Sequence, residues 1–504
     1  MKYLLYSACS YAHPHFGVLL DEAERLHKEG HEVIFTYCSG VIDSCFMNPQ
    51  ANKARCKLCK LCYNTTLSKL SKGILVVPLK DINSSEKYSF TYNSIDEIKN
   101  IKYRNVYVGY SVLSTYISIT RNPYPEISID SKKYFDHLIE QTCRLTSRVY
   151  ELVEKHKPNV ISIYNGRFFE NRPFYDIAKF LNLQFISNEV VGGPRSNELF
   201  SKVSFNNCLP HDIQNNCDTV KFVWNSSDKD TSEKIIDGES FFTKRRNGLP
   251  AADKVYINGQ VKGLMPSNWD DNKKNIVIFN SSEDEFAAVG KDFEEYSLFK
   301  SQIDGIKYLL SCINDKNYHF YLRVHPNLKN IPYKYHTDLY TLENDYDNIT
   351  VIKASDSVST YDIMDKADKV VVFGSTMGVE ASFWHKPVVL LSGAMYYYLD
   401  MCYIPRSQEE LSQLLKEDLK PKSNLAAIFY GYYMMNRNVL STDCKYFDIN
   451  YKTFILGNVK INMAKYLTIL GSNKLMKLIL VIWLRTIPLL FKNKINMPDP
   501  FFKE

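Results

Sequence analysis

Residues 3–35 read YLLYSACSYAHPHFGVLLDEAERLHKEGHEVIF, and this stretch decides the class of fold. Residues 3–6 form a short apolar run that is typical of a buried strand. Apolar residues then recur at helical spacing from Gly17 to Glu29, and Gly30 marks the end of that helix. A second strand opens at residues 33–35. A strand, a helix and a strand in this order predict a parallel sheet with a right-handed crossover.

The same alternation continues along the chain, around residues 144–187 and again over 274–391. Residues 225–272 are rich in Ser, Asp, Lys, Asn and Gly, which is typical of a connection between domains. A chain of 504 residues is also longer than one hydrophobic core usually supports. We therefore predict an α/β protein with two Rossmann-like, doubly wound domains that face a cleft. The predicted parts are an N-terminal domain at 1–265, a C-terminal domain at 266–425 and a helical extension at 426–504.

Charge and hydropathy set expectations about partners and location. The formal net charge is +6, and no arginine-rich run accompanies it, so a nucleic-acid partner is not expected. The apolar run at the start of the chain is too short for a signal peptide, which favours the cytoplasm and reduced cysteines. The stretch 475–491 is apolar but interrupted by charges, as in an interfacial helix. Contact with the inner face of the cytoplasmic membrane through 473–495 and a helix packed back on the N-terminal domain remain alternatives.

Three polar clusters follow predicted strands of the C-terminal domain, where open parallel sheets bind their ligands. Arg and His side chains neutralise a departing phosphate, and hydroxyls with free N–H groups at a helix start hold one. Gly378 is expected to let a ligand approach the backbone, and Glu380 to accept from ribose hydroxyls. Ordinary helix-capping loops are the alternative interpretation. The candidate donor-binding residues are Ser281, Ser282, Glu283, Arg323, His325, Ser375, Thr376, Gly378 and Glu380.

A transfer to an acceptor hydroxyl also needs a general base. His13 and His15 follow the first strand, and Asp284 lies in the first polar cluster of the C-terminal domain. We predict that the base is His15 or Asp284. The alternative for the two histidines is a loop without a role in proton transfer.

The order of the motifs resembles a known family. FNSSEDE (279–285), RVHP (323–326) and FGSTMGVEA (373–381) are similar to the bacterial capsule and lipopolysaccharide biosynthesis glycosyltransferases of GT-B architecture. The first strand–helix–strand and YNGR (164–167) resemble their N-terminal domain. The resemblance implies a nucleotide-sugar donor in the C-terminal domain and no catalytic metal. It places His325 as a catalytic residue that faces the donor phosphate or the transferring sugar. It implies an oligosaccharide or lipid-linked saccharide acceptor near His13, Asn165 and Arg167.

The predicted function is therefore transfer of a sugar from a nucleotide-sugar donor to a growing surface polysaccharide, either capsule or O-antigen. One alternative is a polyol-phosphate or sugar-phosphate transferase of teichoic-acid type. Another is a non-catalytic protein of polysaccharide assembly that binds sugar nucleotides.

Four cysteines are closely spaced in the N-terminal domain: Cys45, Cys56, Cys59 and Cys62. Four thiolates at such spacing suit a structural zinc ion or an iron–sulfur cluster. The alternative is four reduced cysteines without metal. An iron–sulfur redox protein would account for this run but not for the two-domain organisation.

Overall fold

The computed structural model describes residues 1–10, 15–80, 88–191, 200–252, 255–313, 315–436, 441–444, 453–456, 459–462 and 493–498. The chain forms two compact units. Unit 1 contains residues 1–120, 125–210 and 440–504, and unit 2 contains residues 121–124 and 211–439. Each unit has its own sheet, which confirms the predicted α/β class with two domains.

Unit 1 has a seven-stranded sheet in the order β12-β6-β5-β4-β1-β2-β3. The strands from β5 to β3 are parallel, as predicted, whereas β6 and β12 pair antiparallel at one edge. Residues of β1 such as Leu4 and Leu5 are fully buried because helices cover the sheet. The strands are β1 Lys2–Ser7, β2 Glu32–Cys38, β3 Leu75–Leu79, β4 Val160–Tyr164, β5 Gln184–Val191, β6 Phe200–Asn206 and β12 Ser441–Cys444.

The helices of unit 1 follow from local signals. Gly30 has φ +84° and ends α1, as predicted. Asn52 caps α2 by accepting from two backbone N–H groups, and Ser128 forms a capping box at the start of α5. Almost every residue of α4 is buried, so α4 is a core helix of unit 1. The helices are α1 His15–Lys28, α2 Lys53–Leu67, α3 Ile95–Lys99, α4 Val108–Thr120, α5 Ile129–His156 and α6 Arg172–Phe180.

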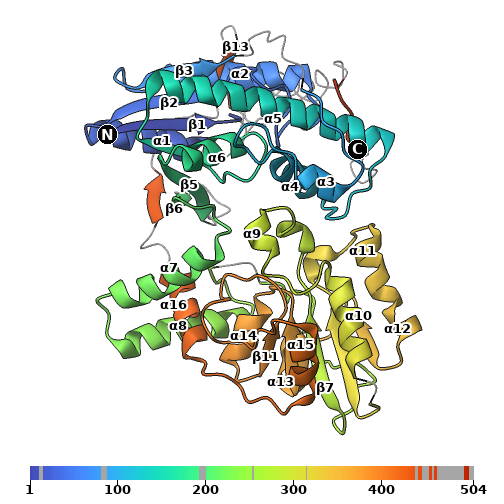
Figure 1. The fold of residues 1–504 in the computed structure, drawn as a ribbon. Helices are drawn as coiled ribbons and strands as arrows, with labels where there is room; N and C mark the ends of the chain where they lie inside the picture. Colours follow the sequence, from blue (N-terminus) through green and yellow to red (C-terminus); the bar gives the residue numbers. More distant parts are fainter. Residues whose placement is uncertain are drawn as a thin grey trace. The chain divides into compact units, whose positions relative to one another are not determined.

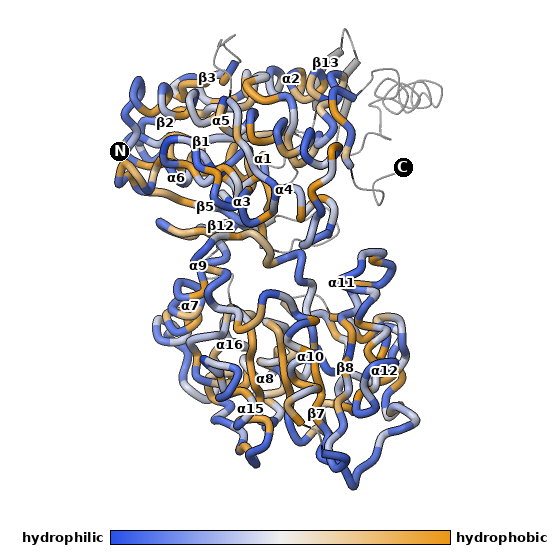
Figure 2. Tube along the Cα trace, turned by 45° about the vertical axis from the view of Figure 1, so that its right-hand side comes forward, coloured by the Kyte–Doolittle hydropathy of each residue, from blue (hydrophilic) through white to orange (hydrophobic). Residues whose placement is uncertain are grey.

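Unit 2 has a five-stranded, all-parallel sheet in the order β11-β10-β7-β8-β9. Its strands are strongly apolar, as the orange segments around β7 and β8 in Figure 2 show. This is the pattern expected when helices cover both faces of a parallel sheet. The strands are β7 Lys274–Phe279, β8 Tyr318–Arg323, β9 Ile349–Ile352, β10 Lys369–Val372 and β11 Val388–Leu390.

The helices of unit 2 surround that sheet (Figure 1). The longer ones are α7 Ile213–Ser226, α8 Thr231–Arg246, α10 Gln302–Cys312, α15 Gln408–Lys416 and α16 Leu425–Asn436. The shorter ones are η1 Glu283–Glu285, α9 Lys291–Glu294, η2 Pro326–Leu328, α11 Lys334–Thr337, η3 Asp338–Thr341, α12 Leu342–Asp345, α13 Thr360–Lys366 and α14 Met377–Phe383.

The boundary between the units differs from the predicted one at residue 265. Residues 231–246 form α8 instead of a connection, and α8 packs closely on α16 within unit 2. The two helices approach at Gly238 and Gly431, where a Cβ on Gly431 would lie 2.3 Å from the Gly238 carbonyl oxygen. The chain passes between the units at 120/121, 124/125, 210/211 and 439/440.

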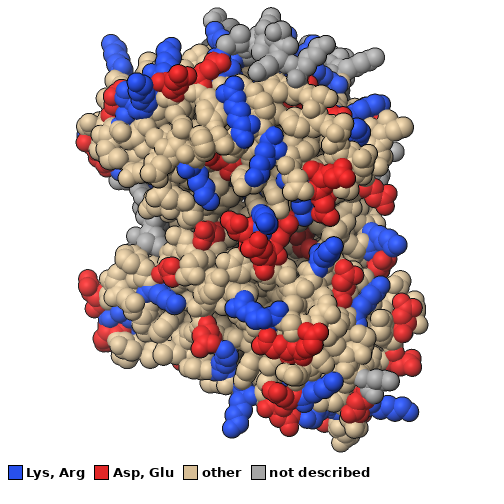
Figure 3. All heavy atoms as spheres, viewed as in Figure 1, with Lys and Arg blue, Asp and Glu red and all other residues tan. Residues whose placement is uncertain are grey.

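The predicted helical extension at 426–504 contains most of α16. Its described residues also include β12 and the antiparallel pair β13 Thr453–Leu456 and β14 Val459–Asn462. The predicted interfacial helix at 475–491 lies outside the described residues. No helix among the described residues is long and apolar enough to span a bilayer. Basic and acidic side chains are interspersed on the face of each unit shown in Figure 3.

Candidate functional site

A pocket in unit 2 lies where three neighbouring parallel strands end. Phe279 ends β7, Arg323 ends β8, and Ser375 follows β10. Because β10, β7 and β8 are adjacent, their carboxyl ends bring these residues together. The pocket holds about 510 Å³ of empty space including its opening, which is the size of a small-molecule site. Its lining includes Arg245, Tyr256, Asn280, Arg323, His325, Tyr361, Ser375, Thr376 and Glu380.

Arg323 carries a buried positive charge at this pocket. Its Nη1 donates to the Lys353 carbonyl (2.8 Å) and its Nη2 to the Asp356 carbonyl (3.1 Å). Nε has no partner, and no carboxylate among the described residues forms an ion pair with this guanidinium. Burial lowers the pKa of Arg323, but a guanidinium stays protonated in proteins. Carbonyl partners therefore fix the group without neutralising it, so it remains able to attract an anion.

His325 lies beside Arg323 as a neutral imidazole. Burial, with the nearby charges of Arg121 and Arg323, lowers the pKa of His325 to about 4. Its Nδ1 accepts from the Asn327 backbone N–H at 3.2 Å, and the backbone N–H of His325 donates to Asn280 Oδ1 at 2.8 Å. With Nδ1 acting as acceptor, the single proton of the neutral ring resides on Nε2. His325 is thus arranged as a hydrogen-bond donor and not as a base.

Glu380 has a different environment from the one predicted. Its side chain is 1% exposed and forms an ion pair with Arg245 Nε at 3.0 Å. The hydroxyl of Tyr361 donates to its other oxygen. Both carboxylate oxygens are therefore engaged within the protein, in an internal Arg–Glu–Tyr arrangement at the pocket wall. A contact of Glu380 with ribose hydroxyls stays a prediction.

The turn after β10 places Ser375 and Thr376 at the pocket. Ser375 Oγ accepts from the Met377 N–H at 3.3 Å, and Gly374 has φ +78°, with Gly393 O 2.7 Å from an added Cβ. Gly378 does not line the pocket. An added Cβ there would lie 2.4 Å from the Tyr396 hydroxyl, so this glycine is required for internal packing and not, as predicted, for ligand approach.

The first predicted cluster, residues 281–285, lies next to the pocket but does not line it. Ser281 Oγ donates to the Phe373 carbonyl at 2.7 Å, and Ser282 Oγ accepts from Asn327 Nδ2 at 3.1 Å. Glu283 accepts from the Tyr124 hydroxyl at 2.6 Å, and burial raises its pKa to about 7. These side chains support the loops around the pocket.

Asp284 forms an ion pair with Arg121, with Nε and Oδ2 3.0 Å apart. Its side chain is 6% exposed, and both of its oxygens accept from the Arg121 guanidinium. Asp284 as the general base stays a prediction, and its carboxylate is already engaged by Arg121.

Unit 1 contains an aromatic pocket at the carboxyl ends of β1 and β4. It holds about 770 Å³ of empty space including its opening. The lining includes Tyr6, Cys9, His15, Phe46, Tyr164, Phe168 and Glu170. His15 stacks on Tyr164 with ring centroids 3.6 Å apart, and burial lowers its pKa to about 4. His15 thus reaches a pocket, as predicted, but its basicity is weak.

Glu170 is a candidate proton acceptor that sequence reasoning missed. It is buried in the aromatic pocket, where Oε1 accepts from the Phe46 N–H at 3.1 Å and Oε2 has no partner. Desolvation raises its pKa to about 7, the range that suits a general base at neutral pH. No motif marks this residue, because its property arises from burial.

The predicted acceptor-side residues lie just behind this pocket. Asn165 has φ 55° and donates to Glu189 Oε1 at 2.5 Å, while its Oδ1 accepts from the Arg167 N–H at 3.1 Å. Arg167 Nη2 donates to Ser118 Oγ at 2.6 Å. These contacts fix the loop that carries Glu170. His13 lies outside the described residues.

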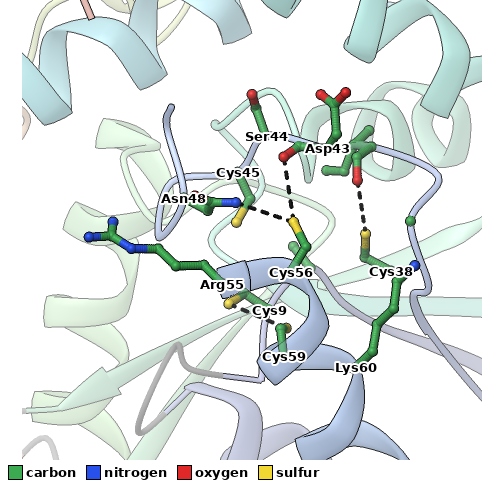
Figure 4. Close-up of a pocket in the computed structure, with 13 residues that line it drawn as sticks. Cys9, Cys38, Asp43, Ser44, Cys45, Asn48, Arg55, Cys56, Cys59 and Lys60 are labelled. Atoms are coloured by element: carbon green, nitrogen blue, oxygen red, sulfur yellow. Dashed lines mark hydrogen bonds between the residues drawn. The ribbon is translucent and has the colours of Figure 1, made fainter. Parts of the chain in front are cut away.

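The four cysteines of the sequence run do not all line the same pocket. Cys45, Cys56 and Cys59 line a second pocket of unit 1, together with Cys9 and Cys38, whereas Cys62 does not (Figure 4). Cys9 and Cys38 lie at the carboxyl ends of the adjacent strands β1 and β2. That placement at neighbouring strand ends is the signal that would have found them in the sequence.

Residues 272–439 match the family model of capsule polysaccharide biosynthesis proteins. This stretch contains the sheet of unit 2 and most of its pocket, and the match confirms the resemblance predicted from the motifs. No curated protein matches the chain.

Several solved structures are similar at low identity. The β-Kdo 2,4-transferase of KpsC from Thermosulfurimonas dismutans is 12% identical, covers 54% of this chain and 79% of its own, and has a TM-score of 0.33. S. aureus MnaA with UDP is 12% identical, with coverages of 87% and 95% and a TM-score of 0.28. The UDP-GlcNAc 2-epimerase of Methanocaldococcus jannaschii with UDP-GlcNAc and UDP is 10% identical, with coverages of 85% and 97% and a TM-score of 0.24. Likenesses at this level do not bear on what the chain binds.

Proposed function

We propose that this chain is a glycosyltransferase that moves a sugar from a nucleotide-sugar donor to a growing surface polysaccharide, capsule or O-antigen. The observation that carries the proposal is the pocket of unit 2, where Arg323 presents a buried cation that forms no ion pair with a carboxylate of the described residues. The surrounding stretch matches a family of capsule polysaccharide biosynthesis proteins.

The donor phosphates would bind in the unit 2 pocket. Arg323 supplies the positive charge, and the Nε2–H of neutral His325 supplies a hydrogen bond without another charge. Hydroxyls of Ser375 and Thr376 line the same pocket. As negative charge develops on the departing nucleotide, these fixed donors stabilise it without rearrangement. In this assignment, side chains of the protein stabilise the phosphate charge, as a divalent cation does in metal-dependent transferases.

The acceptor sugar would bind in the aromatic pocket of unit 1. Aromatic side chains such as Tyr164 and Phe168 line it and offer apolar faces to a sugar ring. Glu170 has one carboxylate oxygen fixed by the Phe46 N–H and the other without a partner. The second oxygen would take the proton of the acceptor hydroxyl as the new glycosidic bond forms. Glu170 therefore replaces His15 and Asp284 as our candidate for the base. An oligosaccharide and a lipid-linked saccharide are both acceptors of this chemistry.

The donor side is tested by thermal stabilisation of the full chain with UDP, GDP, CDP, CMP and dTDP, since a ligand of the native state raises the melting temperature. The nucleotide that stabilises the chain most is then titrated against Arg323→Met and Arg323→Lys. Loss of charge-assisted hydrogen bonds worth about 1.5–3 kcal/mol predicts a 10- to 150-fold weaker affinity for Arg323→Met, with Arg323→Lys between it and wild type.

Lys353→Met is the matched control, because its side chain is exposed and only its carbonyl contacts Arg323. Its affinity should equal that of wild type. If no nucleotide stabilises the chain, or if Arg323→Met binds as well as wild type, the assignment of the donor site is wrong. Transfer itself is followed by mass spectrometry of saccharides incubated with the matching nucleotide sugar.

A further inference from the structure

Five thiols surround one pocket of unit 1 that the proposed transfer reaction does not use. They come from separate segments of the chain: the end of β1, the end of β2, the following loop, and α2. Cys9 and Cys38 meet because β1 and β2 are adjacent parallel strands. Cys56 and Cys59 are one helical turn apart, so they face the pocket together. The five are Cys9, Cys38, Cys45, Cys56 and Cys59.

Cys9, Cys45, Cys56 and Cys59 are neighbours, and the sulfurs of Cys9 and Cys59 are in contact. Cys9 Sγ and Cys59 Sγ are 3.8 Å apart, and Cys9 also interacts with Cys45 through their side chains. In Figure 4 the sulfur of Cys38 lies apart from these four, and it contacts the Ile42 carbonyl at 3.7 Å. A pair of sulfurs bound to one zinc ion by bonds of about 2.3 Å would be separated by about 3.8 Å, so the spacing of Cys9 and Cys59 fits such a pair.

Hydrogen-bond donors point at the sulfurs. The Ser10 N–H lies 3.3 Å from Cys59 Sγ and its hydroxyl 3.2 Å, and Asn48 Nδ2 donates to Cys56 Sγ at 3.2 Å. Such bonds are the usual outer contacts of metal-bound thiolates, because they stabilise charge on sulfur. Arg55 and Lys60 also line the pocket and add positive charge beside it.

The loop that carries Cys45 is held in place. Cys45 and Asn48 exchange two backbone hydrogen bonds, and Asn48 Oδ1 accepts from the Asn52 N–H at 3.0 Å. The Asn52 side chain in turn caps α2, the helix of Cys56 and Cys59. One chain of asparagine contacts therefore fixes the loop relative to the helix, which is the kind of support that preformed ligand sets have.

We propose that Cys9, Cys45, Cys56 and Cys59 bind a metal centre through their thiolates. This ligand set takes Cys9 from the end of β1 in place of Cys62, the last member of the sequence run. Four thiolates suit a single zinc ion or an iron–sulfur cluster, and both share this chemistry. Among the described residues, no three His, Cys, Asp or Glu side chains already surround one point. Binding therefore requires the thiols of Cys45 and Cys56 to turn toward the Cys9–Cys59 pair.

The function of such a centre would be structural. It would join the end of β1, the loop after β2 and α2, and Cys9 also lines the adjacent aromatic pocket. Metal binding contributes directly to the stability of the folded state. The centre does not depend on the proposed transfer reaction.

The test starts with the full chain purified without oxygen and supplied with Zn²⁺, or with iron and sulfide. About one zinc per chain without colour indicates a mononuclear site, and iron with matching sulfide and visible absorption indicates a cluster. Either result supports the proposal. A folded chain that takes up neither overturns it.

Two further measurements identify the ligands. Cys9→Ser should lose the metal, whereas Cys62→Ser and the unit 2 control Cys312→Ser should retain it, with circular dichroism confirming the fold. In the wild-type chain, the metal should protect Cys9, Cys45, Cys56 and Cys59 from alkylation, as mapped by mass spectrometry, so the test does not depend on a variant that folds. Retention by Cys9→Ser, or metal-independent alkylation of these four, overturns the assignment.

Discussion

Replacing Glu380 with Gln separates an internal role of this residue from a ligand-binding role. Glu380 and Arg245 form a buried pair, with side chains 1% and 6% exposed. Removing one partner of a buried pair costs about 3–5 kcal/mol, because the other charge stays buried without its counter-ion. Gln keeps one acceptor oxygen for the Arg245 N–H, and its NH2 group can donate to the Tyr361 hydroxyl oxygen, so the lower value of about 3 kcal/mol is expected. For a unit of this size, that loss lowers the melting temperature by about 6–12 °C.

The assay is thermal unfolding of the full chain without nucleotide, followed by a double-mutant cycle with Arg245→Met. Removing both charges should recover most of the lost stability, because apolar replacement of a buried ion pair is close to neutral. Nucleotide affinity, measured well below the melting temperature, should change little in Glu380→Gln. If Glu380→Gln melts within about 2 °C of wild type but binds nucleotide much more weakly, the internal role is wrong and Glu380 contacts the ligand directly.

Two further substitutions test the assignment of the base. The kcat/KM of the wild type should rise as the pH increases through about 7, because Glu170 acts as a base only when deprotonated. Glu170→Gln should lose this pH dependence, and its rate should fall about 10²- to 10⁴-fold while its donor affinity stays unchanged. A normal pH profile in this variant would contradict the assignment of Glu170 as the base. Asp284→Asn should lower stability by about 1 kcal/mol through loss of the half-buried pair with Arg121 and leave turnover close to wild type. A large loss of turnover at unchanged stability would return Asp284 to the candidates.

The sequence predicts proximity well where the fold is regular. Arg323, His325 and Ser375 were expected at one site because each follows a strand of a parallel sheet, and the structure places them around one pocket. Arg245 was not expected there, because it belongs to α8, whose polar composition resembles a connection. Its contact with Glu380 depends on how α8 packs, and no local pattern encodes that packing.

Side-chain environment is harder to predict than position. Glu380 follows the Gly-Ser-Thr turn as a ligand-binding residue would, but its carboxylate is engaged by a partner 135 positions earlier in the chain. The spacing of the cysteine run favoured Cys62, whereas the pairing of β1 and β2 brings Cys9 to the pocket instead. In both cases, contacts between residues far apart in the chain decide which side chains are neighbours, and linear spacing does not encode those contacts.

Burial raises the pKa of Glu170 and lowers the pKa values of His15 and His325. The two pockets therefore have different electrostatic characters. In unit 2, His325 stays neutral at pH 7 and Glu380 is compensated by Arg245, so Arg323 is left as the net charge of the pocket wall. Such a pocket favours an anion. In unit 1, His15 is neutral and Glu170 is divided between its two protonation states near pH 7. That pocket favours an uncharged hydroxyl and can accept its proton, so one pocket suits a phosphate and the other a sugar.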